Sequence, residues 1–292
     1  MRVPFLLLSA VGVVCTGPHS AHGQHPVDVQ RRSAEAEHLT ALVTYEKLPR
    51  RVVTSDARIA AARSAWALSM PDRAIDEFER AVLDPALDHT AQARLHLSSG
   101  IVHFQEGRYQ VAVVKAEKAV ELIDEAGPLR SKALFLWGES LYRLGSPGGA
   151  AERYSQALAE GAPEDKPEIH FAIGVCERRL GRLELAREHF EKVPLRHERT
   201  AETMRHLAEL ALEAKNYPSA AFWLTRGRSE HPDRFLDSWT DYALVRAAIH
   251  RGDLSEVREL RSTAQSKYPA SDGWLTLLNA AAEAYEWQVL QR

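Results

Sequence analysis

A pair of small residues that recurs along the chain constrains its fold more than any other feature. Within each pair the second residue lies twelve positions after the first, and the second members of successive pairs are 34 to 38 residues apart. Six pairs share this register: Ala62/Ala74, Gly100/Ala112, Gly138/Ala150, Gly174/Ala186, Ala208/Ala220 and Val245/Val257. A fixed inner spacing, with all the variation outside it, is typical of a repeated structural unit.

Two further positions keep the same register. Seven residues after the first member lies a residue that favours a helix end, usually glycine: Ser69, Gly107, Gly145, Gly181, Lys215 and Gly252. Seven residues after the second member lies another small or apolar residue: Ala81, Ala119, Ala157, Val193, Gly227 and Ala264. Glycine tolerates the left-handed conformation in which many helices end, so each unit is predicted to be two helices joined by a tight turn.

The small residues have a physical role in such a unit. They lie where two antiparallel helix axes approach most closely, and a large side chain there would push the helices apart. Apolar residues at helical spacing run through both helices of most units, for example Leu134, Trp137 and Leu141 followed by Tyr154. One unit cannot bury these faces alone, so neighbouring units must stack.

These marks resemble the tetratricopeptide repeat family, most clearly in the third unit, with Leu134, Trp137-Gly138, Leu141, Gly145, Ala150, Tyr154 and Ala157. The resemblance implies an all-α fold, a right-handed superhelical solenoid of about six helix-turn-helix repeats over residues 56–270. The repeats are predicted at 56–90, 91–128, 129–163, 164–197, 198–235 and 236–270. Residues 271–292 are predicted to form a capping helix with a stripe of Trp274, Leu277, Leu278, Ala281, Ala282, Tyr285 and Val289.

The chain begins with a pattern typical of a secretory signal. Met1-Arg2 supplies a positive charge, residues 3–14 are apolar, and Ala21 and Gly23 are the small residues that a signal peptidase reads. We therefore expect residues 1–23 to be removed and the protein to be exported, most simply to the periplasm. In the N-terminal segment 24–55 we expect disorder over 24–29 and one helix over 30–48. A lipid anchor on Cys15 is an alternative, although Gly12-Val13-Val14 before it fits a lipoprotein signal poorly.

The sequence offers no catalytic, cofactor-binding or metal-binding site. It has no phosphate-binding GxxxxGK, no GxGxxG after a strand pattern, no HExxH and no paired CxxC. Its 13 histidines are scattered, and its 37 basic and 40 acidic residues give none of the basic excess of a nucleic-acid-binding protein. We expect a protein that is not an enzyme.

The resemblance implies that the first helix of each repeat lines a concave groove for a protein or peptide partner. The corresponding positions here are Leu97, Ile101, Phe104, Phe135, Tyr142, Arg143, Phe171, Arg178, Arg179 and Tyr242. Aromatic and Arg side chains often anchor partners, but each aromatic could instead pack between repeats. Glu139, Val175 and Glu209 replace the asparagines of the family's peptide-terminus clamp, so that clamp is not expected.

The residues Tyr142, Arg143, Arg178 and Arg179 are predicted to bind an acidic segment that also carries apolar side chains. A competing interpretation pairs the same arginines with Glu139 and Glu177. The function expected is a scaffold or adaptor in the bacterial cell envelope. Two alternatives stay open: a lipoprotein component of an outer-membrane or secretion assembly, and a helical domain that regulates an enzyme or binds glycans.

Overall fold

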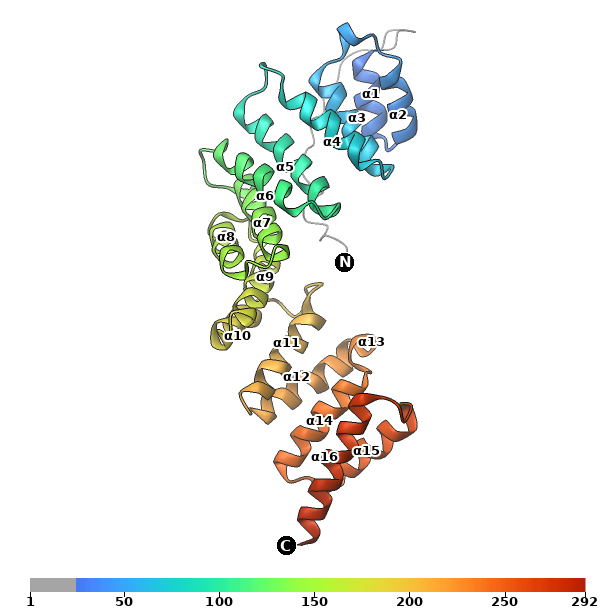
Figure 1. Ribbon diagram of the computed structural model, residues 1–292, viewed down its shortest axis with the longest axis vertical. Coiled ribbons are helices and arrows are strands. Elements are labelled where there is room, and N and C mark those ends of the chain that lie inside the picture. Colours follow the sequence, from blue (N-terminus) through green and yellow to red (C-terminus); the bar gives the residue numbers. More distant parts are fainter. Residues whose placement is uncertain (1–24, 292) are drawn as a thin grey trace. The chain divides into compact units, whose positions relative to one another are not determined.

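The protein is helical throughout the part that the structure describes. The structure is a computed structural model, and it describes residues 25–291. Over these residues it contains no strand, which confirms the predicted all-α fold of paired helices (Figure 1). The predicted signal segment, its cleavage near Gly23 and the alternative lipid site at Cys15 lie outside the described residues.

The chain divides into two compact units, and the first ends at Leu180. Its helices are α1 (Pro26–Ala34), α2 (His38–Glu46), α3 (Ser55–Ala67), α4 (Pro71–Val82), α5 (His89–Gln105), α6 (Tyr109–Glu121), α7 (Pro128–Arg143), α8 (Pro147–Glu160) and α9 (Lys166–Arg179), with a 3-10 turn at Arg50–Val52. From α1 to α9 each helix packs against the next one along the chain. This is the contact pattern of stacked helix pairs.

The second unit runs from Gly181 and is described to residue 291. Its helices are α10 (Leu183–Glu191), α11 (Thr200–Glu213), α12 (Tyr217–Glu230), α13 (Pro232–Phe235), α14 (Ser238–Arg251), α15 (Leu254–Lys267) and α16 (Gly273–Leu290). The pairs α11/α12 and α14/α15 pack within themselves, and α16 packs on both α14 and α15. The boundary between the units falls inside the fourth predicted repeat.

The turn positions of the predicted register adopt the expected conformation. All six residues have positive φ: Gly107, Gly145, Gly181 and Gly252 at 73° to 81°, and Ser69 and Lys215 at 58° and 57°. Residues other than glycine seldom adopt this conformation. Its presence at Ser69 and Lys215 shows that the helix-pair geometry requires a left-handed turn there even when the residue is not glycine.

The small-residue positions are buried in every predicted repeat. At Gly138 an added Cβ would lie 2.7 Å from Cε1 of Tyr154, a ring that is itself only 1% exposed. Position 138 therefore requires glycine, because the Tyr154 ring of α8 lies directly against the α7 backbone. This is the close approach that the sequence predicts for the third repeat.

The N-terminal segment differs from its prediction. The prediction of a single helix over 30–48 is wrong. The chain turns at Ala36, whose φ is 59°, and forms the two helices α1 and α2 instead. Disorder over 24–29 is wrong from Pro26 onward, because α1 begins there, with His25 and Asp28 forming a reciprocal cap.

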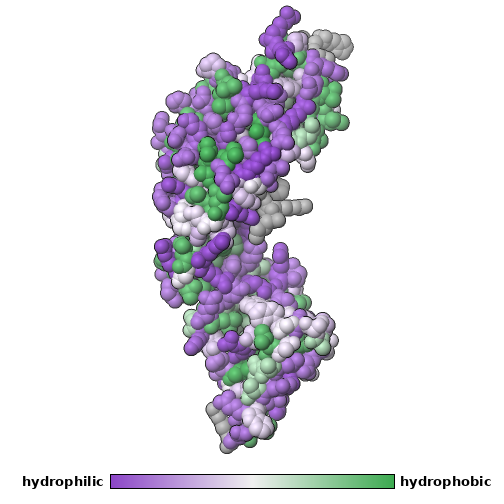
Figure 2. Space-filling model, viewed as in Figure 1, coloured by the Kyte–Doolittle hydropathy of each residue, from purple (hydrophilic) through white to green (hydrophobic). Residues whose placement is uncertain are grey.

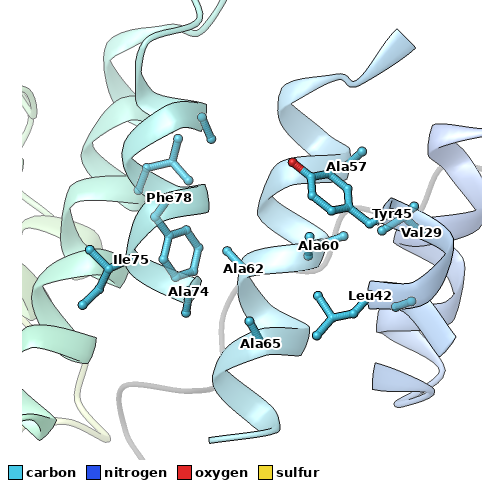
Figure 3. Packing of buried hydrophobic residues seen from close by; sticks show 14 of the residues in the cluster. Val29, Leu42, Tyr45, Ala57, Ala60, Ala62, Ala65, Ala74, Ile75 and Phe78 are labelled. Atoms are coloured by element: carbon cyan, nitrogen blue, oxygen red, sulfur yellow. The ribbon is translucent and has the colours of Figure 1, made fainter. Parts of the chain in front are cut away.

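These two helices extend the repeat by one pair. Val29 and Ala41 are twelve residues apart, Ala36 lies seven after Val29, and both Val29 and Ala41 are fully buried. Figure 3 shows Leu42 and Tyr45 reaching from α2 towards α3, while Phe78 approaches α3 from the other side. The array therefore begins before residue 56.

The C-terminal helix α16 confirms the prediction of a final helix, but its buried face is narrower than the predicted stripe. Leu275, Leu278 and Ala282 are buried, whereas Trp274 and Leu277 are exposed. Ala282 lies 37 residues after Val245, so α16 occupies the position of a further first helix. None of the helices within residues 25–291 has the length and apolar character needed to cross a membrane.

Candidate protein-interaction surface

Five of the predicted groove residues contribute to the core rather than to the surface. Only 4–8% of each is exposed: Leu97, Ile101, Phe104, Phe135 and Phe171. Phe135 of α7 packs on Tyr154 of α8, with their ring centroids 5.3 Å apart. Leu97 and Phe104, together with Ile101, join the apolar cluster formed by α5, α6 and α7. A partner could not reach these side chains without opening the helix pairs.

The arginines predicted at the groove lie closer to solvent, on a support of aromatic rings. Tyr142 and Arg178 are half-buried, and Arg143 and Arg179 are exposed. The guanidinium carbon of Arg179 lies 5.2 Å from the ring centroid of Tyr142, and that of Arg143 lies 5.8 Å from the ring centroid of Phe104. Contacts of this kind hold a cation over a ring face. They connect α5 to α7 and α7 to α9.

The two glutamates of the competing interpretation lie in different settings. The Tyr154 hydroxyl donates a hydrogen bond of 2.6 Å to Oε1 of Glu139. Burial, followed by the charge and hydrogen bond of Glu139, raises the pKa of Tyr154 well above its usual value. Glu177 is buried on α9. Glu139 therefore has at least one role inside the α7/α8 pair.

The tenth predicted residue, Tyr242, belongs to the second unit. Its ring packs on Trp274 with the centroids 5.3 Å apart, and the Arg246 guanidinium carbon lies 5.9 Å from its centroid. The sequence prediction did not include Arg246, although it follows Tyr242 by one helical turn. It placed Trp274 in the buried stripe of α16, whereas the side chain is 42% exposed.

A shallow groove of about 260 Å³ lies between α14 and α16. It is lined by Arg246, Ile249, His250, Ala281, Ala284, Tyr285 and Gln288. On the face drawn in Figure 2 hydrophilic residues predominate and apolar residues form separate patches. A groove with an apolar floor and a few polar groups suits a short peptide segment better than a large flat interface.

The described residues offer little for catalysis. No group of three or more His, Cys, Asp or Glu within residues 25–291 is arranged to hold a metal ion. Cys176 is fully buried, and burial, with the charges of Glu139 and Glu177, raises the pKa of its thiol to about 12. A thiol with this pKa stays protonated near neutral pH and is a poor nucleophile.

Comparison with known families decides the nature of the repeat. The sequence profile described as "Tetratricopeptide repeat" matches residues 59–129 and 135–196. These stretches cover the small-residue pairs from Ala62 to Ala186. The protein is a tetratricopeptide repeat protein.

Solved structures with the same fold extend the likeness beyond the matched stretches. PilF of Pseudomonas aeruginosa is 17% identical with a TM-score of 0.57, over 71% of this chain and 92% of PilF. PilW, a type IV pilus biogenesis factor, is 16% identical with a TM-score of 0.55, over 76% of this chain and 96% of PilW. YrrB, a tetratricopeptide repeat protein with an unusual peptide-binding site, is 22% identical with a TM-score of 0.50, over 61% of this chain and 86% of YrrB.

At these identities the solved structures support the fold alone. No curated protein matches the sequence of this tetratricopeptide repeat protein. Its binding properties must therefore be argued from its own side chains.

Proposed function

We propose that this tetratricopeptide repeat protein is a non-catalytic scaffold or adaptor that binds a segment of another protein on the first helices of its repeats. The observation that carries the proposal is the shared register of buried small residues and positive-φ turns, which makes each of the two units an array of similar helix pairs. Within a unit, stacked pairs of this kind present a regular surface suited to binding extended partners.

In the first unit we propose that the partner is acidic and also carries apolar side chains. Tyr142 and the arginines around it supply an aromatic ring and positive charge on α7 and α9. The edge of a guanidinium that lies on a ring matches the two oxygens of a carboxylate in geometry and charge. In the competing interpretation Glu139 and Glu177 pair with the same arginines, and an incoming carboxylate must then replace them to bind.

We also propose that the protein works in the cell envelope. The support is the N-terminal pattern of a charged start, an apolar run and small residues at Ala21 and Gly23. An intact-mass measurement on protein from its native cells should show loss of a segment ending near Gly23. A full-length cytoplasmic product would exclude export. Acyl chains on Cys15 would instead favour the lipoprotein alternative.

Cross-linking in native cells, followed by mass spectrometry of the captured proteins, tests the proposed function. The double variant Arg143→Glu, Arg178→Glu should lose at least about ten-fold of the captured partner, and rising salt should weaken capture by the wild type. The control Arg108→Glu, Lys118→Glu reverses two exposed charges that lie off the first helices and should capture as the wild type does. Unchanged capture by the first variant would place the partner elsewhere.

A further inference from the structure

Arg246 is the one helical arginine from α11 to α15 that contacts no carboxylate among residues 25–291. The other seven each lie within ion-pair distance of an acidic side chain: Arg205, Arg226, Arg228, Arg234, Arg251, Arg258 and Arg261. Arg246 is half-buried, and its guanidinium lies over the ring of Tyr242. A partly desolvated guanidinium without a counter-charge favours an anion at that place.

The groove that Arg246 lines offers no carboxylate as a counter-charge. The α14/α16 groove is lined by His250, Gln288 and the Tyr285 ring beside Ile249 and two alanines, and none of its lining residues is Asp or Glu. His250 stacks on Tyr217, with the ring centroids 3.5 Å apart, and neither ring carries a negative charge. The groove is therefore positively charged over an apolar floor.

An aromatic pair adjoins Arg246 at the start of the two helices. Tyr242 packs on Trp274, and Trp274 is 42% exposed although it is large and apolar. From Tyr242 to His250 the α14 face extends about 12 Å at 1.5 Å per residue. This length accommodates about four residues of an extended chain at about 3.3 Å each.

We propose that the α14/α16 groove binds a peptide segment that places a carboxylate on Arg246 and a large apolar side chain against Trp274. The carboxylate oxygens accept hydrogen bonds from the guanidinium, and Gln288 offers an amide donor nearby. A polyanion such as a nucleic acid would need a row of cations, whereas this groove supplies one arginine and one histidine. The proposal rests on the proposed function and adds a second binding site, in the second unit.

Selection from a random dodecapeptide phage library on the immobilised full chain tests this proposal. Peptides retained by the wild type should be enriched in Asp or Glu within a few residues of an aromatic or Leu. The best peptide, labelled for fluorescence anisotropy, should bind at least about ten-fold more weakly when its acidic residues are changed to Asn or Gln. Retention of no peptides, or of peptides without acidic enrichment, would overturn the proposal.

The variant Arg246→Gln should weaken binding of the selected peptide at least about ten-fold, because it replaces a charged donor to the carboxylate by a neutral one. The matched control Arg234→Gln removes an arginine whose side chain is 66% exposed and lies outside the groove, and it should bind as the wild type does. Circular dichroism should show equal helix content in both variants. Equal binding by Arg246→Gln and the wild type would overturn the proposal.

The same variant separates this proposal from the proposed function. If Arg246→Gln abolishes peptide binding but cells yield no cross-linked protein, the groove stands and the scaffold function fails. If cells yield a partner whose capture requires Arg143 and Arg178 while the selected peptide binds Arg246→Gln normally, the scaffold function stands and the groove proposal fails.

Discussion

The helix pairs α7/α8 and α14/α15 occupy the same register but fill it in different ways. In α7/α8 the first small position is Gly138, and the Tyr154 ring lies directly on its backbone. In α14/α15 the corresponding positions are Val245 and Arg261. Val245 is fully buried in the apolar cluster that α14 shares with α15 and α16. At these two positions the buried apolar side chain thus belongs to the second helix in one pair and to the first helix in the other.

The difference changes what the second helix does. Tyr154 is only 1% exposed and points into its own pair. Arg261 points to α16, where it donates a hydrogen bond to Oδ1 of Asn279 and forms ion pairs with Glu283 and Glu286. In α14/α15 the position that corresponds to Tyr154 therefore holds an arginine, and this arginine binds the next helix through polar contacts. Each such contact at the surface contributes little stability, so the two pairs should respond very differently to substitution.

The largest effect is expected for Tyr154→Arg. The variant places an arginine at the position that corresponds to Arg261 in α14/α15, but Gly138 remains where that pair has Val245. It removes a buried ring and places a cation where the ring packed on Gly138. We expect a loss of about 3–5 kcal/mol in the free energy of unfolding of the first unit. Urea unfolding followed by circular dichroism measures it, and a loss under about 1 kcal/mol would contradict the packing described here.

Ala150→Trp should be the next most damaging change. Ala150 is fully buried where α8 meets α7, so a large ring can enter only by separating the helices. Overpacking of this kind costs about 1–3 kcal/mol or more. Ala159→Trp, the same change at an exposed position of α8, is the matched control and should alter stability by less than about 0.5 kcal/mol. Equal melting of the two variants would remove the packing argument at Ala150.

Gly138→Ala is a smaller test of the same contact. The added Cβ would lie 2.7 Å from Cε1 of Tyr154, which outweighs the gain of about 1 kcal/mol from replacing a helical glycine. We expect a net loss of about 1–2 kcal/mol. Gly148→Ala adds the same methyl group in α8 with nothing within 4 Å, and it should be neutral or slightly stabilising. Stabilisation by both changes would show that the Tyr154 ring moves away freely.

The smallest effect is expected for Arg261→Tyr, which gives α14/α15 the aromatic of α7/α8. Val245 is already buried where α7/α8 has Gly138, so the ring would remain at the surface and the variant would lose only the polar contacts with α16. A change within about 1 kcal/mol follows. Thermal unfolding of the variant beside the wild type measures it. A loss as large as that of Tyr154→Arg would mean that the two positions are equivalent after all.

The sequence predicted the repeated pairs because small residues and turn residues act locally and leave a fixed spacing. It missed the α1/α2 pair because Val29 is larger than the family's small residues and Ala36 stands where glycine is usual. It missed α13 because four residues are too few for a periodic pattern. Phe235 of that helix covers Gly227, which explains the glycine at a position where other repeats have alanine or valine.

The proposed binding surface was less predictable than the fold. The register assigned residues to the first helices correctly, but whether Phe104 or Phe135 is covered depends on side chains from neighbouring helices. The sequence could not predict that Arg246 contacts no carboxylate among residues 25–291. Ion pairs such as Arg228–Asp241 form between separate helices, so the pairing of each arginine depends on the packing. A sequence pattern identifies the helix face, and the packing decides which side chains on it reach solvent.

A double-mutant cycle between Gly138 and Tyr154 tests the packing account most directly. The cycle combines Gly138→Ala with Tyr154→Leu and measures the free energy of unfolding of the four proteins in urea. Because Leu removes the ring that meets the new Cβ, Gly138→Ala should cost at least about 1 kcal/mol less in the Leu background than in the wild type. Additive losses, with Gly138→Ala equally damaging in both backgrounds, would contradict the assignment of the glycine to the Tyr154 ring.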